Sequence, residues 1–257
     1  MKALSYQDSI KKLNEVFEEQ GRLVFPRFGD ADLIMMTKES GEVGRANKNH
    51  CNPTTKKMMR DSLNIDGDSV VVGIPCNIQG AKHIGSNVPG SIKNIKLEKK
   101  NDFISWTALE HAFFKYNDEF ISFFSKLKDK SYIFVGTYYN QYLDNFYGNN
   151  VGWVETPKYD SINHTEKIIQ DLRTLLDTEK VDSVILSCGQ AARVICHSLH
   201  DIYTNINFID VGSQSDMFIV NQPEFNDIPK RSHIQHQLQQ IKEKVKFYES
   251  RINNNNS

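Results

Sequence analysis

The sequence has few cysteines, and their spacing argues against two classes of protein. There are four among 257 residues, and no pair follows the Cys-x-x-Cys spacing of zinc and redox motifs. Neither a disulfide scaffold nor a structural zinc site is therefore predicted. Cysteine behaves as a small apolar side chain, so we expect buried free thiols at Cys51, Cys76, Cys188 and Cys196.

Long apolar runs and an excess of charge of one sign are also missing. No run approaches the roughly 18 apolar residues of a membrane-spanning helix, and the first residues lack the apolar stretch of a signal peptide. We therefore expect a soluble, cytoplasmic protein without a transmembrane segment. With 31 basic and 32 acidic residues the net charge is -1, which does not indicate a nucleic-acid partner.

The second half of the chain contains a regular alternation of strand-like and helical segments. Short apolar runs alternate with segments of helical period. Such alternation implies crossover connections between parallel strands. We predict an α/β fold that is Rossmann-like, with a largely parallel sheet flanked by helices. The predicted strands are Tyr132–Val135, Val151–Glu155, Ser183–Ser187 and Asn207–Val211, and the predicted helices cover 138–147, 164–178 and 190–200.

The first half predicts two further strands and several helices. One helix ends at Gly21, a favourable stop signal. Another starts at Asn52-Pro53 and reaches Leu63, and residues 76–100 predict a long loop. The predicted strands are Leu23–Phe28 and Ser69–Ile74, and further helices begin near Asp32 and cover 102–124, the last with aromatic side chains that favour core packing.

The C-terminal segment has the spacing of a coiled-coil seam. Its apolar residues alternate between steps of four and three, for about two heptads: Ile234, Leu238, Ile241, Val245 and Tyr248. Packing against the body of the protein is favoured, and a homodimer through 234–248 is the alternative. We divide the chain into one domain (1–225), a C-terminal helix (226–252) and a disordered tail (253–257).

Two carboxylates follow the first predicted strand, one residue apart. Residues 27–32 read Arg-Phe-Gly-Asp-Ala-Asp, and α/β proteins bind ligands at the carboxyl ends of their strands. Clustered carboxylates suit a divalent cation that also holds substrate phosphates, and arginine suits phosphate directly. The segment therefore predicts a phosphate site beside Arg27 and a metal ion held by Asp30 and Asp32.

Two later strands end in similar segments. Residues 187–193 contain Gly189 at the start of a predicted helix, whose free N–H groups favour phosphate, and Arg193 adds a charge one turn later. Tight packing of the helix on the sheet is an equally good interpretation. The third segment, 210–216, follows the next strand. The carboxyl ends of parallel strands meet at one edge, so all three segments are predicted to form one site.

Other titratable residues are weaker candidates. His83, Glu110 and His111 suit acid–base chemistry, but the sequence names no partner for them, so positions without a catalytic role are favoured. Asp66-Gly67-Asp68 also carries two aspartates. Because it precedes a strand, an ordinary turn is predicted there.

Taken together, the three segments resemble the GT-D class of nucleotide-sugar glycosyltransferases in their order and spacing. Members carry Arg-aromatic-Gly-Asp-Gly-Glu, then Gly-Pro-Thr-Ala-Lys at a helix start, then Asp-(Ile/Val)-Gly-His-x-Asp. The likeness spans roughly residues 20–220. The matching segments are Arg27-Phe28-Gly29-Asp30-Ala31-Asp32, Gly189-Gln190-Ala191-Ala192-Arg193 and Asp210-Val211-Gly212-Ser213-Gln214-Ser215-Asp216.

The resemblance implies a UDP-sugar donor and a Mn²⁺ or Mg²⁺ ion between the acidic pair and the diphosphate. The chain departs from the family pattern at Ala31, Asp32, Arg193 and Ser213, which replace glycine, glutamate, lysine and histidine. The predicted catalytic residues are Asp30, Asp32 and Asp216, the last as a base chosen on position. The predicted donor-binding residues are Arg27, Gly29, Gly189, Arg193, Asp210 and Gly212.

The predicted activity is metal-assisted transfer of a sugar from a UDP-sugar to a hydroxyl group of a glycan or glycoprotein. Two alternatives stay open. One is a nucleotide- or glycan-binding protein without catalysis. The other is a different α/β enzyme acting on nucleosides or phosphates, such as a hydrolase or a phosphorylase.

Overall fold

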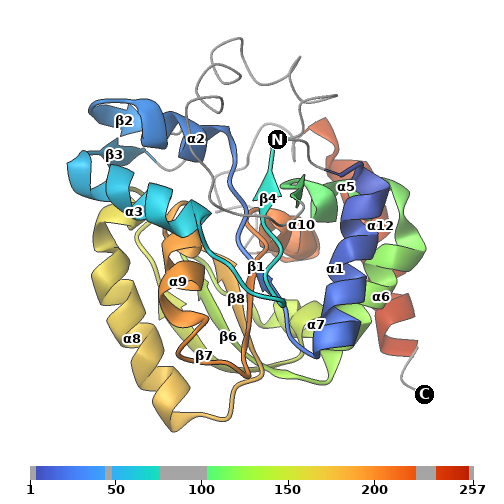
Figure 1. The fold of residues 1–257 in the computed structure, drawn as a ribbon. Coiled ribbons are helices and arrows are strands. Elements are labelled where there is room, and N and C mark those ends of the chain that lie inside the picture. Colours follow the sequence, from blue (N-terminus) through green and yellow to red (C-terminus); the bar gives the residue numbers. More distant parts are fainter. Residues whose placement is uncertain (1–3, 44–47, 76–102, 224–235, 255–257) are drawn as a thin grey trace.

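The computed structural model describes residues 4–43, 48–75, 103–223 and 236–254 (Figure 1). Its strands are β1 (Val24–Phe25), β2 (Gly41–Val43), β3 (Asn49–Cys51), β4 (Gly73–Ile74), β5 (Ile104–Ser105), β6 (Ser131–Gly136), β7 (Asn149–Glu155), β8 (Ser183–Ser187) and β9 (Asn207–Asp210). Its α-helices are α1 (Tyr6–Gln20), α2 (Asp30–Thr37), α3 (Pro53–Leu63), α5 (Ala108–Lys115), α6 (Asn117–Lys128), α7 (Asp144–Tyr147), α8 (Thr165–Thr178), α9 (Ala191–Leu199), α10 (Gln214–Phe218) and α12 (Leu238–Asn254). Short 3-10 helices are η1 (Gln141–Leu143), η2 (Ser161–His164) and η3 (Ile219–Asn221).

The central sheet has the order β1-β9-β8-β6-β7, and its strand pairs are parallel. On the other side of β1, Val24 and Arg27 form parallel bridges to Val70 and Gly73, and β5 pairs in parallel with β4. The carboxyl ends of these strands therefore meet at one edge. The predicted α/β fold with a largely parallel sheet is confirmed.

Helices cover both faces of the sheet (Figure 1). One face packs against α2, α3, α8 and α9, and the other against α1, α5, α6, α7, α10 and α12. Successive residues of β8 alternate between these cores, with Val184 and Leu186 in the first and Ile185 in the second. Strands buried on both faces are apolar throughout, which explains the apolar runs of the sequence.

The aromatic segment predicted as one helix over 102–124 is a strand and two helices. Ile104 N–H donates to Val72 O, at 3.1 Å, which makes the start of the segment a strand. The chain leaves helical geometry at Tyr116, between α5 and α6. Phe113 and Phe120 are fully buried, so the aromatic side chains belong to the core, as the sequence favoured.

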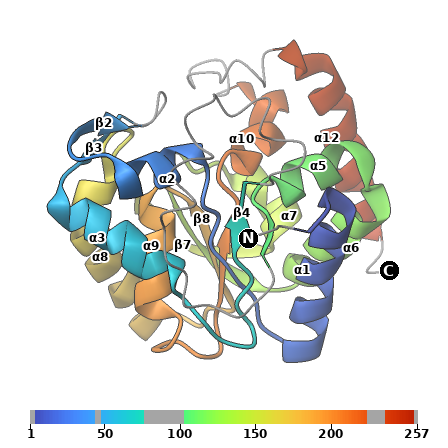
Figure 2. The same cartoon turned by 45° about the horizontal axis from the view of Figure 1, so that its top comes forward.

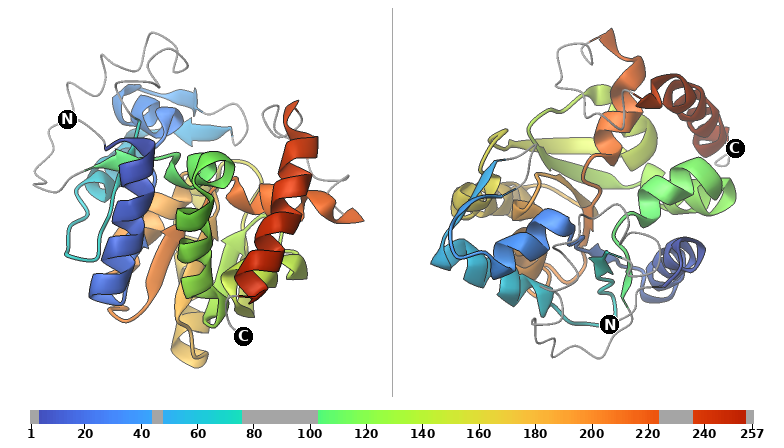
Figure 3. Two further views of the ribbon diagram at one scale, coloured as in Figure 1. Left: turned by 90° about the vertical axis from the view of Figure 1, so that its right-hand side faces the viewer. Right: turned by 90° about the horizontal axis from the view of Figure 1, so that it is seen from above.

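The C-terminal helix α12 packs along α6, and α1 flanks α6 on its other side (Figure 3, left). Ile241, Val245 and Tyr248 of the apolar seam are buried, and the Tyr248 hydroxyl donates to Phe113 O, at 2.6 Å. The seam therefore packs on the body of the protein, as favoured, and the homodimer stays a prediction. The helix extends to Asn254, past the predicted start of the disordered tail.

A β2–β3 hairpin that the sequence did not predict lies beside α2 and α3 (Figure 2). The predicted helix over 138–147 is η1 followed by α7. The predicted loop at 76–100, with His83 and Cys76, lies outside the described residues. The other three cysteines are buried free thiols. No helix within the described ranges is both long and apolar enough to cross a membrane.

Candidate functional site

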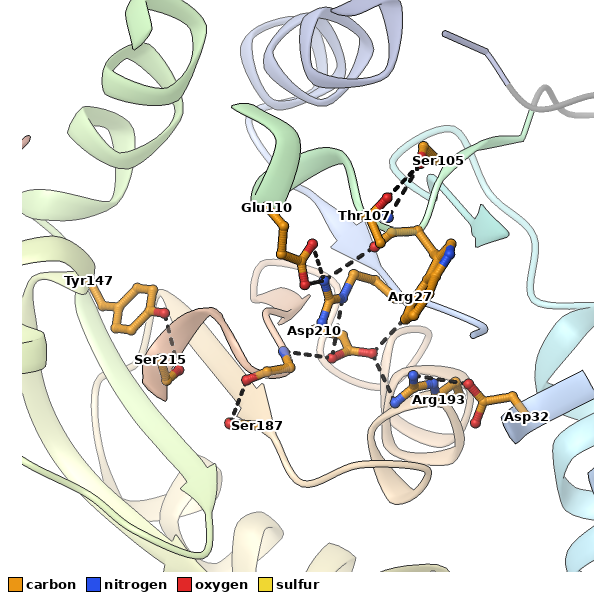
Figure 4. Close-up of polar contacts among 12 residues, drawn as sticks. Arg27, Asp32, Ser105, Thr107, Glu110, Tyr147, Ser187, Arg193, Asp210 and Ser215 are labelled. Atoms are coloured by element: carbon orange, nitrogen blue, oxygen red, sulfur yellow. Dashed lines mark hydrogen bonds and ion pairs between the residues drawn. The ribbon is translucent and has the colours of Figure 1, made fainter. Parts of the chain in front are cut away.

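Five charged side chains form a continuous chain of ion pairs at the carboxyl edge of the sheet (Figure 4). Arg27 Nη1 lies 2.9 Å from Glu110 Oε1, and Arg27 Nε lies 3.7 Å from Asp210 Oδ1. Arg193 bridges Asp210 Oδ2, at 3.1 Å, and Asp32 Oδ2, at 3.0 Å. We call these five residues the charge network. Four of the side chains are almost fully buried, while that of Glu110 is 19% exposed.

The members of the charge network come from five places in the chain. Arg27 follows β1 and Asp210 ends β9. Asp32, Glu110 and Arg193 lie near the starts of α2, α5 and α9. The three segments that the sequence singled out are therefore brought together at one edge, as their positions after parallel strands indicated.

A glycine allows Arg27 to reach its partners. Gly212 has a φ of +50°, and a Cβ there would lie 1.8 Å from Arg27 Nη2, so glycine meets both the backbone and the space requirement. Arg27 Nη1 also donates to Trp106 O, at 3.2 Å. Burial lowers the pKa of the Arg27 guanidinium, but Glu110 and Asp210 outweigh it and the pKa is raised. Arg27 therefore keeps its charge.

The Asp32 side chain caps the amino end of α2. Its Oδ2 accepts the N–H of Gly29, at 2.6 Å, in addition to its ion pair with Arg193. The indole of Trp106 packs on Gly29, where a Cβ would come within 2.9 Å of the ring. Burial raises the pKa of the Asp32 carboxyl above its ordinary value, although the Arg193 charge and the Gly29 N–H work against the rise.

The two carboxylates assigned to the metal ion differ in exposure. Asp30 is exposed, and its Oδ1 accepts the N–H of Ala31, at 2.8 Å, whereas Asp32 is buried. Both belong to α2, and side chains two residues apart on a helix do not face each other. Asp30 is therefore the accessible carboxylate of the pair, and a metal role for the buried Asp32 stays a prediction. Within the described ranges, no group of three or more His, Cys, Asp or Glu side chains is suited to a metal.

Asp30 by itself does fit a metal ion that is shared with a phosphate ligand. Mg²⁺ is commonly held by one or two carboxylates together with substrate phosphates. The exposed Asp30 carboxylate at the amino end of α2 supplies one such oxygen ligand. Asp32 instead serves the charge network and the helix start.

The turn predicted to hold phosphate is present at the start of α9. Gly189 has a φ of +62°, and its carbonyl accepts the N–H of Ala192, at 3.2 Å, and the guanidinium of Arg193. Ser187 Oγ donates to Gly212 O, at 2.7 Å, so the second and third predicted segments are in contact. The guanidinium of Arg193 already faces two carboxylates, so it lacks an uncompensated charge for a phosphate.

Asp216, the predicted base, is half-buried near the start of α10. The Tyr147 hydroxyl lies 3.2 Å from Ser215 Oγ. Burial is the main cause of a raised pKa of this phenol; Arg27 acts against the rise and Asp216 adds to it. Asp216 follows the carboxyl end of β9 by six residues, which places it near the same edge of the sheet.

Buried polar atoms without hydrogen-bond partners concentrate at this edge. Nine such side-chain atoms occur in the part of the chain that the structure describes, and seven of them belong to the three predicted segments. Leaving such an atom unsatisfied costs about 1–3 kcal/mol, and in native structures it calls for an explanation such as a functional role. The seven are Arg27 Nε, Asp32 Oδ1, Arg193 Nε and both amide atoms of Gln190 and Gln214.

Glu110 and Trp106 belong to the site, although no sequence pattern pointed specifically to either residue. Glu110 was a weak candidate because its partner Arg27 lies 83 residues away, and no local pattern encodes that contact. Trp106 was part of an aromatic stripe assigned to the core. His111 stacks on Tyr6 instead, with ring centroids 3.5 Å apart.

Comparisons with known proteins agree with this architecture. No protein-family model matches the sequence, and no curated protein matches it. Among solved structures, a glycosyltransferase (DUF1792) from Streptococcus sanguinis has a TM-score of 0.65 at 15% identity, over 86% of this chain and 85% of that one. A selenomethionine-substituted domain of unknown function 1792 has a TM-score of 0.61 at 14% identity, over 91% and 98%.

A third structure is described as the highly conserved domain of unknown function 1792 with a distinct glycosyltransferase fold. It has a TM-score of 0.59 at 15% identity, over 91% of this chain and 98% of that one. At identities this low, the structural similarity establishes the fold alone. The chain therefore has a divergent form of the DUF1792 glycosyltransferase fold, which confirms the predicted resemblance at the level of the fold.

Proposed function

We propose that this protein is a glycosyltransferase that moves a sugar from a UDP-sugar to a hydroxyl group of a glycan or glycosylated protein. One observation carries the proposal. The three segments that resemble the GT-D motifs converge on a single charge network, at the carboxyl edge of a sheet with the DUF1792 glycosyltransferase fold. Ligands of α/β proteins bind at this edge.

The charge balance of the site supports a role for a metal ion. The charge network contains three carboxylates and two guanidinium groups. Arg27 and Arg193 each face two carboxylates, so neither brings an uncompensated positive charge to a diphosphate. We assign both a positioning role, in which they hold the strand ends in register.

A divalent ion held by Asp30 and the donor's phosphate oxygens would neutralise the charge on the departing UDP. The turn at Gly189 and the amino end of α9 offer backbone N–H groups suited to phosphate. Asp216 stays our candidate for the base that accepts the proton of the attacking hydroxyl.

Calorimetry with UDP tests the proposed site. Wild-type protein is expected to bind UDP more tightly with Mn²⁺ than without it, and Asp30→Ala is expected to lose this difference. Asp68→Ala is the matched control, because Asp68 is an exposed aspartate in the turn before β4, at the opposite edge of the sheet. Equal Mn²⁺ dependence in Asp30→Ala and wild type would contradict the assignment of Asp30.

The second candidate is a nucleotide- or glycan-binding protein without catalysis. The observation that favours it is the burial of Asp32, which leaves Asp30 as the exposed carboxylate of the pair. Binding of UDP without turnover of any UDP-sugar would support this candidate. Preference for free nucleosides or simple phosphate esters over UDP-sugars would instead favour another α/β enzyme.

A further inference from the structure

Exposed aromatic side chains gather where β6 and β7 end. In the described part of the chain, five large apolar or aromatic side chains are exposed. Three of them, Tyr138, Trp153 and Tyr159, lie in β7 or within a few residues of the carboxyl ends of β6 and β7. Single exposed apolar residues need no explanation, but an exposed aromatic ring that is held in one orientation offers a stacking surface to a ligand.

The indole of Trp153 is fixed in orientation. Its Nε1–H donates to the carbonyl of Gly136 at the end of β6, at 2.9 Å, yet 41% of the residue stays exposed. Tyr139 lies beside it, with ring centroids 6.1 Å apart. The Tyr139 hydroxyl is itself anchored on Asp144 Oδ1, at 3.0 Å. The indole polar group is therefore satisfied within the protein, while much of the ring stays available to a ligand.

An exposed polar side chain follows the indole along β7. Glu155 lies two residues after Trp153, on the same face of the strand, and is exposed. A sugar ring combines an apolar C–H face with a rim of hydroxyl groups. The C–H face is attracted to the negative face of an aromatic ring, and the rim is suited to a carboxylate neighbour such as Glu155.

A short path of contacts joins this surface to the proposed donor site. Gly136 pairs in register with Ser187 of β8, and Ser187 Oγ donates to Gly212 O. Gly212 in turn lies against the Arg27 guanidinium. The ends of β6 and β9 are separated by two strand spacings, or about 10 Å, which is on the scale of a short saccharide.

We propose that Trp153, with Tyr138 and Tyr139, forms a platform that binds a saccharide unit of the acceptor. The assignment of that saccharide as an acceptor rests on the proposed function, whereas its binding does not. Trp153 supplies the stacking surface, and Tyr139 supports it from the side. A glycan lying on the platform extends along the carboxyl edge toward the segment 210–216, which carries the proposed base Asp216.

A glycan array probed with the labelled protein, in the absence of any nucleotide, tests this proposal. Binding to a subset of the printed glycans is expected. The free oligosaccharide of the strongest spot is then titrated while tryptophan fluorescence is followed. The chain has two tryptophans, so the difference between wild type and Trp153→Phe isolates the Trp153 signal, which is expected to change on binding.

Variants decide whether the platform is the binding surface. Trp153→Ala is expected to bind the oligosaccharide about tenfold more weakly, or ~1.4 kcal/mol, while Trp153→Phe keeps most of the affinity because it keeps an aromatic face. Ile202→Ala, which removes an exposed side chain elsewhere, is the matched control and is expected to bind as wild type. Circular dichroism checks that each variant is folded.

Three results would overturn the proposal. They are no binding to any glycan on the array, equal affinity in Trp153→Ala and wild type, and light scattering that shows a dimer which Trp153→Ala dissociates. Because these measurements contain no donor, they can fail while UDP-sugar turnover succeeds. The reverse outcome, glycan binding without turnover, would count against the proposed function and leave the platform in place.

Discussion

Arg193→Met tests the charge network most severely. Arg193 lies between Asp32 and Asp210 and pairs with both. All three residues are at least nine-tenths buried. Methionine keeps much of the volume but leaves two buried carboxylates without their shared counter-charge. Removing one partner of a buried ion pair costs about 3–5 kcal/mol, so we expect a loss of stability in this range near pH 7.

The loss is expected to depend on pH. Without Arg193, the burial of Asp32 is no longer opposed by a neighbouring positive charge, so its folded-state pKa rises further above the unfolded value of about 4. The folded protein then binds more protons than the unfolded chain, so its stability falls as pH rises through this window. The pKa of Asp32 is already raised in the wild type, and loss of Arg193 is expected to raise it further. The deficit of Arg193→Met is therefore expected to be largest near pH 7 and to shrink toward pH 4.5.

Urea unfolding followed by far-ultraviolet circular dichroism measures the effect. With a slope near 3 kcal/mol per M, the midpoint is expected to fall by roughly 1–2 M at pH 7. Adding Asp32→Asn is expected to restore part of the loss, because it removes one unpaired charge. The exposed Arg173 provides the control Arg173→Met, with an expected effect within about 0.5 kcal/mol. A loss below about 1 kcal/mol for Arg193→Met, or a loss equal at pH 7 and pH 4.5, would refute the reasoning.

Further predictions concern single positions near the site. Gly212→Ala is expected to lower stability by at least about 2 kcal/mol more than Gly21→Ala. Both glycines have a positive φ, but a Cβ at Gly212 would collide with the Arg27 guanidinium, whereas a Cβ at Gly21 would meet no atom within 4 Å. Equal urea midpoints of the two variants would contradict this. Glu110→Gln removes a negative charge at the site, so calorimetry without metal should show UDP binding about fivefold tighter, and weaker binding would argue against a diphosphate there. Burial raises the pKa of the Cys188 and Cys196 thiols, so iodoacetamide at pH 8 is expected to label them only in unfolded protein, as mass spectrometry would show.

The sequence predicted the long-range assembly of the site better than its local geometry. Parallel strands place their carboxyl ends together, so Arg27, Arg193 and Asp210 were expected at one edge and are found there. The orientation of Asp30 and Asp32 depends on where α2 begins. Because the helix starts at Asp30, Asp32 lies in its first turn, where its carboxylate accepts the N–H of Gly29 and is buried.

The Glu110–Arg27 contact and the strands β2 and β3 correspond to no recognisable sequence pattern. Glu110 and Arg27 meet across 83 positions. The pairing of β5 with β4 and the bridge between Gly73 and Arg27 bring their segments together. The β2 and β3 strands have three residues each, too few to show a period of two. The strands of the central sheet, by contrast, were predicted because each contains a short apolar run bounded by polar turns.

Release of UDP from a panel of UDP-sugars, with Mn²⁺ and with glycan acceptors, tests the central claim most directly. We expect the wild-type protein to turn over at least one UDP-sugar. Asp30→Ala is expected to lose several kcal/mol of transition-state stabilisation, or about 100-fold or more in rate, and Asp68→Ala is expected to match wild type. Failure of the wild-type protein to release UDP from any member of the panel, or equal rates for wild type and Asp30→Ala, would contradict the account.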